Sequence, residues 1–292
     1  MDENLTSLLD RLNSLLTRAE QLLPEPIPPT EWQNALAFRW HRRGERGWLQ
    51  PLEQIDSIRL ADLIGIDRQK KAVSRNVRQF MAGLPANNIL LWGSRGTGKS
   101  SLLKALLNEF GDDGLRLIEI DRNDLLQLPE ILRMVSERSE KFLLFCDDLS
   151  FESGDAGYKA LKVVLDGSLT VSLDNLLVCA TSNRRHLMPE PQSDNLATRH
   201  EDGEIHFGEG VEERISLSDR FGLWLAFHPF DQQEYLQIVQ HWLDHYGLGD
   251  QLPEARELAL RWALTRGSRS GRTAWQFARD WAGGQALSDQ TG

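Results

Sequence analysis

The sequence predicts an α/β fold in which helices flank a parallel sheet of five strands. Five short apolar runs alternate with segments of helical period, and unbroken rather than alternating hydrophobicity is typical of strands buried on both faces. The first apolar run leads directly into a glycine-rich motif of the kind that binds phosphate. The expected strands are residues 88–92, 115–120, 142–146, 176–180 and 223–227, and helical patterns lie around residues 100–110, 125–139 and 158–165.

Composition and charge narrow the class of protein. The chain has 292 residues and a formal net charge of -10, which argues against a protein that coats nucleic acid through its overall field. No apolar run approaches the roughly 20 residues needed to span a bilayer, and the N-terminus lacks the pattern of a secretory signal. Cys146 and Cys179 both lie within apolar runs, so we expect buried, reduced thiols. We expect a cytoplasmic protein with no membrane partner.

The N-terminal segment, residues 1–55, predicts a helical extension that ends in a Pro-rich connector. Such a helix either packs on its own domain, which we favour, or serves oligomerisation or the docking of a partner. Its apolar residues recur at alternating spacings of three and four, as in a helix seam, and they are Leu5, Leu8, Leu12, Leu15, Ala19 and Leu22. Four prolines end the helix and stiffen the connection; they are Pro24, Pro26, Pro28 and Pro29.

Aromatic and basic residues interleave between residues 30 and 51. We expect an amphipathic helix there, with its aromatic side chains buried and its arginines solvated. The alternative is a surface that stacks on bases and neutralises phosphates. The residues concerned are Trp32, Phe38, Arg39, Trp40, His41, Arg42, Arg43, Arg46 and Trp48.

The strongest signal is a P-loop motif after the first expected strand. The glycines let backbone N–H groups curl toward phosphate oxygens, and the helix that begins near Lys99 adds its positive end. Lys99 should reach the β- and γ-phosphates of ATP, Ser100 should ligate Mg²⁺, and Ser101 completes the nucleotide-binding set. The motif reads Gly93-Ser94-Arg95-Gly96-Thr97-Gly98-Lys99-Ser100.

Two adjacent acids end the expected strand at residues 142–146. A P-loop protein needs a carboxylate at the end of a neighbouring strand to hold the waters of the metal. We assign Asp147 to the metal side and Asp148 to polarising the attacking water, with Glu152 as the alternative to Asp148. The sequence therefore predicts a site for ATP and Mg²⁺.

With these motifs the chain resembles the AAA+ superfamily over about residues 60–277. The segment Ala-Asp-Leu-Ile-Gly-Ile lies where AAA+ proteins place an apolar stretch against adenine, so the resemblance implies adenine contacts for Leu63, Ile64 and Gly65. The segment Cys-Ala-Thr-Ser-Asn ends a later strand. There the resemblance implies that Asn183 is the sensor 1 residue, which orients the attacking water.

The same resemblance implies two arginines that stabilise charge in the transition state. The segment Ser-Asp-Arg-Phe-Gly resembles the one that carries an arginine finger to a neighbouring subunit. This favours Arg220, with Arg214 and Arg199 as alternatives. The segment Gly-Ser-Arg-Ser-Gly-Arg resembles sensor 2 of the C-terminal subdomain and favours Arg272 over Arg269. A finger that acts on a neighbour implies a homo-oligomer.

A closer resemblance links the chain to an uncharacterised bacterial family of predicted AAA+ ATPases. It is carried by residues 87–93, 145–152 and 181–187, and it implies no substrate. One departure bears on the rate: many AAA+ proteins carry Asp-Glu where this chain has Asp147-Asp148. Because the shorter acid sets its carboxylate further back, we expect slow hydrolysis or hydrolysis that depends on a partner.

We divide the chain into the helical extension at 1–55, an α/β nucleotide-binding domain at 56–230 and a helical lid at 231–292. The acidic stretch at 189–213 is expected to form an exposed loop or hairpin. We expect Mg²⁺-dependent ATP hydrolysis coupled to a conformational change on an unknown protein partner. The alternative is a nucleotide-gated module or loader that acts on DNA or a DNA-bound complex with slow hydrolysis. A small-molecule kinase would leave Asn183 and the helical tail unexplained.

Overall fold

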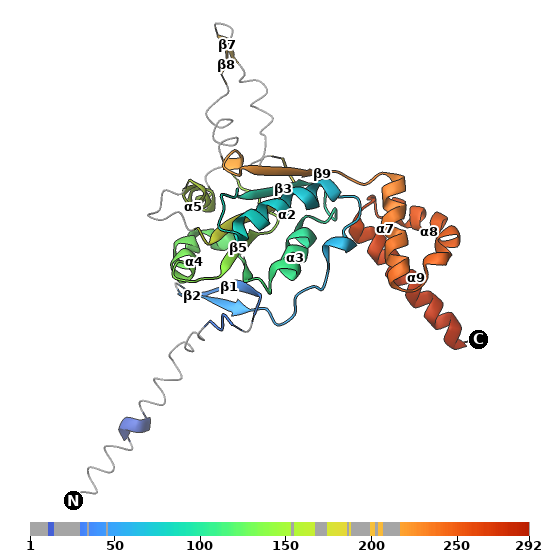
Figure 1. Ribbon diagram of the computed structural model, residues 1–292, viewed down its shortest axis with the longest axis horizontal. Coiled ribbons are helices and arrows are strands. Elements are labelled where there is room, and N and C mark those ends of the chain that lie inside the picture. Colours follow the sequence, from blue (N-terminus) through green and yellow to red (C-terminus); the bar gives the residue numbers. More distant parts are fainter. Residues whose placement is uncertain are drawn as a thin grey trace, which may run out of the picture.

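The computed structural model contains one large sheet with helices on both faces, and the C-terminal part of the chain forms a helical lobe (Figure 1). It describes residues 11–14, 30–33, 35–44, 46–152, 155–166, 174–185, 187, 199–201, 204–206 and 217–291. All five expected strands are present and parallel, which confirms the predicted fold class. They are β3 (Ile89–Gly93), β4 (Leu115–Glu119), β5 (Lys141–Cys146), β6 (Leu176–Ser182) and β9 (Leu223–Phe227).

The sheet has seven strands rather than the five expected, because β1 (Ala37–Arg43) and β2 (Arg46–Pro51) extend it to the order β2-β1-β4-β5-β6-β3-β9. These two strands form an antiparallel hairpin, and β1 joins the sheet through parallel pairing with β4. Our prediction of a helix at residues 30–51 is therefore wrong. Phe38 and Trp40 are buried, whereas Arg39 between them is exposed, and this period of two is that of a strand.

Helices cover both faces of the sheet. On one face lie α2 (Asp67–Met81) and α3 (Lys99–Phe110); on the other lie α4 (Leu128–Val135), after the short helix η2 (Arg122–Gln127), and α5 (Ala156–Leu165). Within β3, Leu91 packs in the same core cluster as Leu102 of α3, whereas Leu90 packs in the cluster of Ile131 of α4. Both faces of the strand are thus buried, which explains the unbroken apolar runs.

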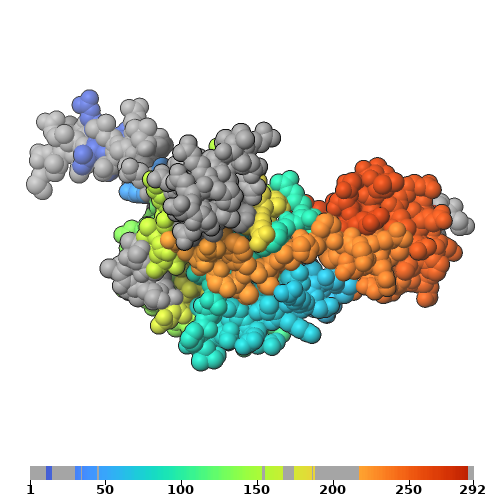
Figure 2. Space-filling model, turned by 90° about the horizontal axis from the view of Figure 1, so that it is seen from above, coloured from blue at the N-terminus to red at the C-terminus, as the bar shows by residue number. Residues whose placement is uncertain are grey.

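The C-terminal lobe is helical, and its described residues, 231–291, are called the lid here. It contains α7 (Gln232–His245), the short helix η4 (Gly249–Gln251), α8 (Leu252–Thr265) and α9 (Gly271–Thr291). A capping box of Asp231 and Glu234 begins α7, which satisfies amides that a helix start leaves unpaired. Tyr235 is fully buried and its hydroxyl donates to the carbonyl oxygen of Ala259 at 3.1 Å. Figure 2 shows the lid as a lobe beside the sheet domain.

Two further predictions concern the N-terminal helix and the acidic stretch at residues 189–213. Residues 11–14 are helical, but the rest of the expected N-terminal helix and the Pro-rich connector lie outside the described residues. The acidic stretch contains the antiparallel hairpin of β7 (Arg199–Glu201) and β8 (Glu204–His206), which confirms the hairpin expected there and projects away from the sheet in Figure 1. Among the helices that the structure describes, none combines the length and the apolar character needed to cross a membrane.

Candidate nucleotide-binding site

The P-loop runs from the end of β3 to the first turn of α3, and its path depends on glycine. Gly93 has a φ of 129°, and a Cβ added there would lie 2.0 Å from the carbonyl oxygen of Phe227 in β9. Only glycine therefore fits between these two strands. The Ser94 amide donates to the same carbonyl oxygen at 3.0 Å, and the Thr97 hydroxyl donates to the Ser94 carbonyl oxygen at 2.7 Å. The loop is thus held by a neighbouring strand and by its own turn.

Lys99 begins α3, and its ammonium group lies inside the loop. Nζ donates to the carbonyl oxygens of Gly93 at 2.9 Å and Ser94 at 2.8 Å, and the residue is only 7% exposed. Burial lowers the pKa of this amine, and the charges of Asp147 and Asp148 offset part of that shift. Phosphate oxygens are stronger acceptors for an ammonium group than neutral carbonyl oxygens, so the arrangement suits an anionic ligand.

Ser100 and Asp147 meet where β5 ends beside α3. Ser100 Oγ donates to Asp147 Oδ1 at 2.7 Å. Hydroxyl and carboxylate oxygens suit Mg²⁺, which usually takes one or two protein ligands and completes its shell with water and substrate phosphates. The described part of the chain holds no group of three or more His, Cys, Asp or Glu residues that could bind a metal. The pair therefore fits a magnesium ion shared with a nucleotide, not one held by protein alone.

Asp148 adopts a left-handed backbone conformation with a φ of 49°, the one positive φ outside glycine among the described residues. For an L-residue this conformation costs roughly 1–2 kcal/mol. Its carboxylate accepts a hydrogen bond from Asn183 Nδ2 and lies 3.4 Å from the guanidinium group of Arg95. The structure thus brings together the acid and the amide that the sequence assigned to the attacking water. It adds a cation from the P-loop that the sequence did not pair with them.

Thr181, which the sequence analysis did not single out, lies between the two acids. The side chain is 1% exposed, and its hydroxyl donates to Asp147 Oδ1 at 2.5 Å and accepts from the Asp148 amide at 2.9 Å. The signal that could have found it is strand register. Cys146 in β5 pairs with Ala180 in β6, so the residues that follow them on parallel strands are neighbours.

The lid reaches the P-loop through the start of α9. The Arg272 amide donates to the carbonyl oxygen of Gly96 at 3.3 Å, and the charge of Arg272 helps to lower the pKa of Lys99. A Cβ added to Gly96 would lie 2.8 Å from Ser270 Oγ, so loop and lid are in close contact. The backbone of Arg272 therefore lies beside the loop, whereas the side chains of Arg272 and of Arg269, the alternative, are both exposed.

The segment expected to contact adenine packs beside the P-loop. It begins with the short helix η1 (Leu60–Asp62), and Leu63 is 7% exposed while Ile64 is half-buried. A Cβ added to Gly98 would meet the side chains of Ile66 and Leu63 at 3.4 and 3.7 Å. These apolar side chains therefore line the loop at Gly98.

The same segment also contacts the lid. Gly65 has a φ of 80°, and a Cβ added there would lie 3.0 Å from the ring of Phe230, immediately before the lid. His241 of α7 places Nε2 3.5 Å from Asp62 Oδ1. The predicted adenine segment thus connects the phosphate loop to the lobe that carries Arg272.

Arg220 lies at the amino-terminal end of the sheet's parallel strands, whereas the P-loop lies at their carboxyl end. It precedes β9, a strand of five residues that runs parallel to β3 with Phe227 opposite Gly93. At about 3.3 Å per residue, such a strand spans roughly 16 Å, so Arg220 lies beyond reach of a nucleotide in its own P-loop. Its Nε forms an ion pair with Asp166 at the end of α5. The structure therefore separates this residue from the other predicted site residues within one chain.

The remaining candidates are placed as follows. Ser101 lies in the first turn of α3, half-buried, and Glu152, the alternative to Asp148, is exposed. Arg199 is the first residue of β7, and Arg214 lies outside the described residues.

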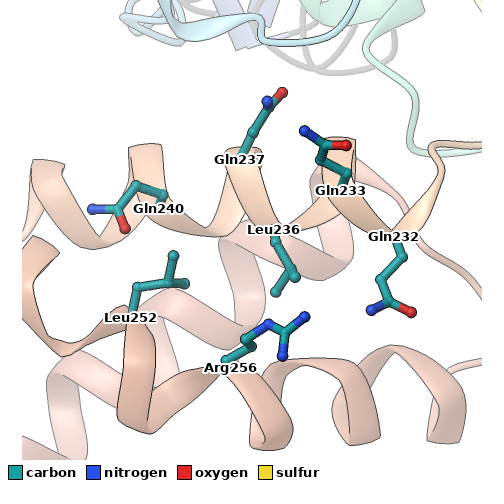
Figure 3. Close-up of a pocket in the computed structure, with 7 residues that line it drawn as sticks. All are labelled: Gln232, Gln233, Leu236, Gln237, Gln240, Leu252 and Arg256. Carbon is teal, nitrogen blue, oxygen red and sulfur yellow. The ribbon is translucent and has the colours of Figure 1, made fainter.

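A separate groove of about 570 Å³ lies on the lid between α7 and α8 (Figure 3). Leu236 and Leu252 form its apolar part and the Arg256 guanidinium lies beside Leu236. Four glutamine amides make up most of the polar lining. No carboxylate stands among its described lining residues.

A P-loop between β3 and α3, acids at the end of β5, Asn183 at the end of β6 and a helical lobe that contacts the loop are the arrangement of P-loop proteins of the AAA+ class. Within that class the chain belongs to the family described as "Protein of unknown function (DUF815)", whose sequence model matches residues 33–285.

Curated relatives are similar to this chain over part of their length. Chaperone protein ClpB of Rhodopirellula baltica is 25% identical over 213 residues, which cover 61% of this chain and 24% of that protein. The Replication factor C large subunit of Staphylothermus marinus is 28% identical over 115 residues, 37% of this chain and 26% of that protein. The chain thus spans about a quarter of the length of these relatives. Among solved structures, a point variant of Thermotoga maritima RuvB has 13% sequence identity and a TM-score of 0.44, covering 76% of this chain and 71% of that one.

Proposed function

We propose that this protein binds ATP together with Mg²⁺ and hydrolyses it to move its lid against a protein partner. The observation that carries the proposal is the contact between lid and phosphate loop. The Arg272 amide donates to the carbonyl oxygen of Gly96 at 3.3 Å, on the same loop whose carbonyl oxygens hold Lys99. A ligand that rearranges this loop would therefore move the lid as well.

Each polar group near the loop has a role in this proposal. The Lys99 ammonium group, which contacts carbonyl oxygens at 2.8 and 2.9 Å, would turn to the β- and γ-phosphates. Ser100 and Asp147 would hold Mg²⁺, which neutralises charge on the phosphates when it is bound. Asn183 and Asp148 would orient the attacking water. Leu63 and its neighbours would face the adenine ring.

Slow or partner-dependent hydrolysis follows from the contacts of Asp148. The Asp148 carboxylate accepts a hydrogen bond from Asn183 on Oδ1 and faces the Arg95 guanidinium with Oδ2 at 3.4 Å, so both of its oxygens are engaged by protein groups rather than by a water. We therefore place the separation of Asp148 from Arg95 before the chemical step. A partner that binds Arg95 would speed hydrolysis.

The position of Arg220 supports a homo-oligomer in this proposal. This residue lies at the end of the strands away from its own P-loop and is paired with Asp166. It would therefore have to act on the nucleotide of a neighbouring subunit. An arginine finger supplied in this way is worth about 10³–10⁵ in rate. Assembly would exchange the partner of Arg220 from Asp166 to the γ-phosphate of that neighbour.

The test is ATP turnover measured over a range of protein concentrations, with molecular mass determined in the same samples. We expect turnover per chain to rise steeply with concentration in the wild type and to fall about 10³-fold or more in Arg220→Ala. Arg133→Ala, which removes an exposed arginine of α4, is the matched control and should behave as wild type. If assembled Arg220→Ala keeps its turnover, the finger assignment is wrong. Tight ATP binding with negligible turnover at every concentration would favour the alternative below.

The cysteines support a place in the cytoplasm. Cys146 and Cys179 are both free and buried, as in proteins of reducing compartments. Burial raises the pKa of the Cys146 thiol to about 12, so this group stays protonated and unreactive at neutral pH.

We also propose that the chain divides into two units that move relative to each other. Residues 56–230 would act as the nucleotide-binding domain and 231–292 as the lid. Residues 37–51 would move with the nucleotide-binding domain because β1 is paired with β4.

The alternative, a nucleotide-gated module that docks on DNA, is favoured by one surface of the β1–β2 hairpin. Cross-strand pairing places His41 opposite Trp48, with ring centroids 5.6 Å apart and planes inclined by 22°. The Arg43 guanidinium lies 5.9 Å from the centre of the Trp48 ring, and Arg43 pairs with Arg46 across the strands. Stacked aromatic rings beside cations are what single-stranded nucleic acids bind.

Two observations weigh against this alternative. Arg39 and Arg42 of the same hairpin form ion pairs with Glu119 at 2.9 Å and Asp124 at 3.3 Å, and the net charge is -10. We therefore favour a protein partner.

The two partners are distinguished by binding of a labelled oligothymidine, with MgATP present, at several salt concentrations. A DNA-binding module should bind at low salt, lose affinity as salt rises and lose it in Trp48→Ala. The matched control is Trp275→Ala, which removes another half-buried tryptophan with a nearby arginine, Arg279 at 5.3 Å. A protein-directed ATPase should show no such salt-dependent binding.

A further inference from the structure

We propose that Thr181 is a positioning residue that directs Asp147 to the metal and Asp148 to the attacking water; the inference rests on the proposed function. Two adjacent carboxylates repel each other unless their surroundings separate them, and these two have to point apart to serve different tasks. Among the described residues, Thr181 is the one whose side chain hydrogen-bonds to the carboxylate of Asp147 and to the backbone amide of Asp148.

The first half of this role concerns the carboxylate of Asp147. Its Oδ1 accepts from the Thr181 hydroxyl at 2.5 Å, from the Ser100 hydroxyl at 2.7 Å and from the Asp148 amide at 3.2 Å. No hydrogen bond to Oδ2 is found within the part of the chain that the structure describes. Three donors on one oxygen fix the rotation of the carboxylate. They leave Oδ2 as the atom that can receive a metal-bound water.

The second half concerns the backbone of Asp148. A hydroxyl has one hydrogen, which Thr181 uses on Asp147, so its lone pairs remain as acceptors. They accept the Asp148 amide at 2.9 Å, and the Thr181 carbonyl oxygen accepts the Leu149 amide at 2.7 Å. These contacts hold the peptide groups on both sides of Asp148, whose φ is 49°. That conformation turns the carboxylate toward Asn183.

The variants separate the hydroxyl from the space it fills. Thr181→Val keeps the shape and removes the hydroxyl, and Thr181→Ser keeps the hydroxyl. Thr181→Ala is the second variant should the valine not fold. The matched control is Ser182→Ala, because Ser182 is equally buried at 1% exposure and its hydroxyl accepts from the Arg184 amide at 3.2 Å rather than from either acid.

Two readouts test the two halves. For the metal side we measure how the affinity for a fluorescent ATP analogue depends on Mg²⁺, together with kcat. Thr181→Val should raise the Mg²⁺ concentration for half-effect about tenfold and lower kcat about 10–100-fold, the range seen for residues that orient metal ligands. Thr181→Ser and Ser182→Ala should stay near wild type. If Thr181→Val matches the wild type, or Ser182→Ala loses as much, the proposal is overturned.

For the backbone side we measure amide-resolved hydrogen exchange in the protein without nucleotide or metal. In Thr181→Val the Asp148 amide should exchange faster, whereas the Leu149 amide serves as an internal reference because its acceptor, a backbone carbonyl oxygen, is retained. Unchanged exchange at Asp148 would refute the role of the hydroxyl.

The exchange measurement also separates failure of this inference from failure of the proposed function. A wild type that binds ATP and Mg²⁺ without turnover would contradict hydrolysis alone. The exchange rates and the Mg²⁺ dependence of binding would still decide the role of Thr181.

Discussion

Replacing Gly93 with alanine should destabilise the fold by more than backbone strain alone, because β3 and β9 leave no room for a methyl group. The new Cβ would lie 2.0 Å from the carbonyl oxygen of Phe227 and 2.8 Å from its carbonyl carbon. Since Cβ atoms essentially never approach other atoms closer than 3.0 Å, the two strands must separate by about 1 Å at this point.

Two terms make up the expected loss. A non-glycine residue in a sparsely populated backbone conformation, here with φ of 129°, costs roughly 1–3 kcal/mol. The separation also stretches the hydrogen bond from the Ser94 amide to Phe227, now 3.0 Å, and a buried polar group left unsatisfied costs about 1–3 kcal/mol. The free energy of unfolding should therefore fall by about 2–6 kcal/mol, a large part of the 5–15 kcal/mol typical of native proteins.

Gly114→Ala is the matched control for this prediction. Gly114 has a φ of 98° with nothing within 4 Å of an added Cβ, so it should show only the strain term of about 1–3 kcal/mol. Urea unfolding followed by circular dichroism gives both losses on the same scale. Equal losses in the two variants would refute the steric reasoning, because the contact with Phe227 would then contribute nothing.

Three further predictions concern charged residues. Burial lowers the pKa of Lys99 from its ordinary value of 10.5, so the unfolded chain holds this proton more tightly and the stability of the wild type rises as pH approaches 10.5. The stability of Lys99→Met relative to wild type should therefore decline over the same pH range. A difference in melting temperature that is constant with pH would contradict this prediction. Arg220→Ala and Asp166→Ala should each change the free energy of unfolding by about 0–1 kcal/mol, as expected for a partly exposed ion pair. If Arg220→Ala instead unfolds the protein, its loss of turnover is no evidence that Arg220 is an arginine finger. Arg272→Ala should lower turnover about tenfold or more, equivalent to about 1.4 kcal/mol, whereas Arg269→Ala should leave it within about twofold. Equal effects in steady-state assays would count against the choice of Arg272 over Arg269, since alanine keeps the backbone amide that contacts Gly96.

Patterns that are local in the chain were readable from the sequence. The five parallel strands appear as unbroken apolar runs because each is buried on both faces, and the P-loop is one contiguous motif between a strand and a helix. Asp147 and Asn183 could be brought to one site because each follows the end of a buried strand, and parallel strands end at a shared edge. The structure places these residues together with Lys99 and Asp148, while the roles assigned to them stay predictions.

Contacts between distant segments were decided by the tertiary structure. Residues 37–51 carry mixed aromatic and basic side chains that fit a helix or a strand, and pairing with β4, as in the contact of Arg39 with Glu119 at a separation of 80 residues, selects the strand. Thr181 lies in the Cys-Ala-Thr-Ser-Asn segment, but the segment does not single it out, and its place between two acids depends on the register of β5 and β6. The position of Arg220 opposite its own P-loop depends on the direction of β9. Periodicity and motifs report on neighbours along the chain, whereas register, strand direction and hydrogen-bond partners arise only when remote segments pack, and for that reason only the folded chain determines them.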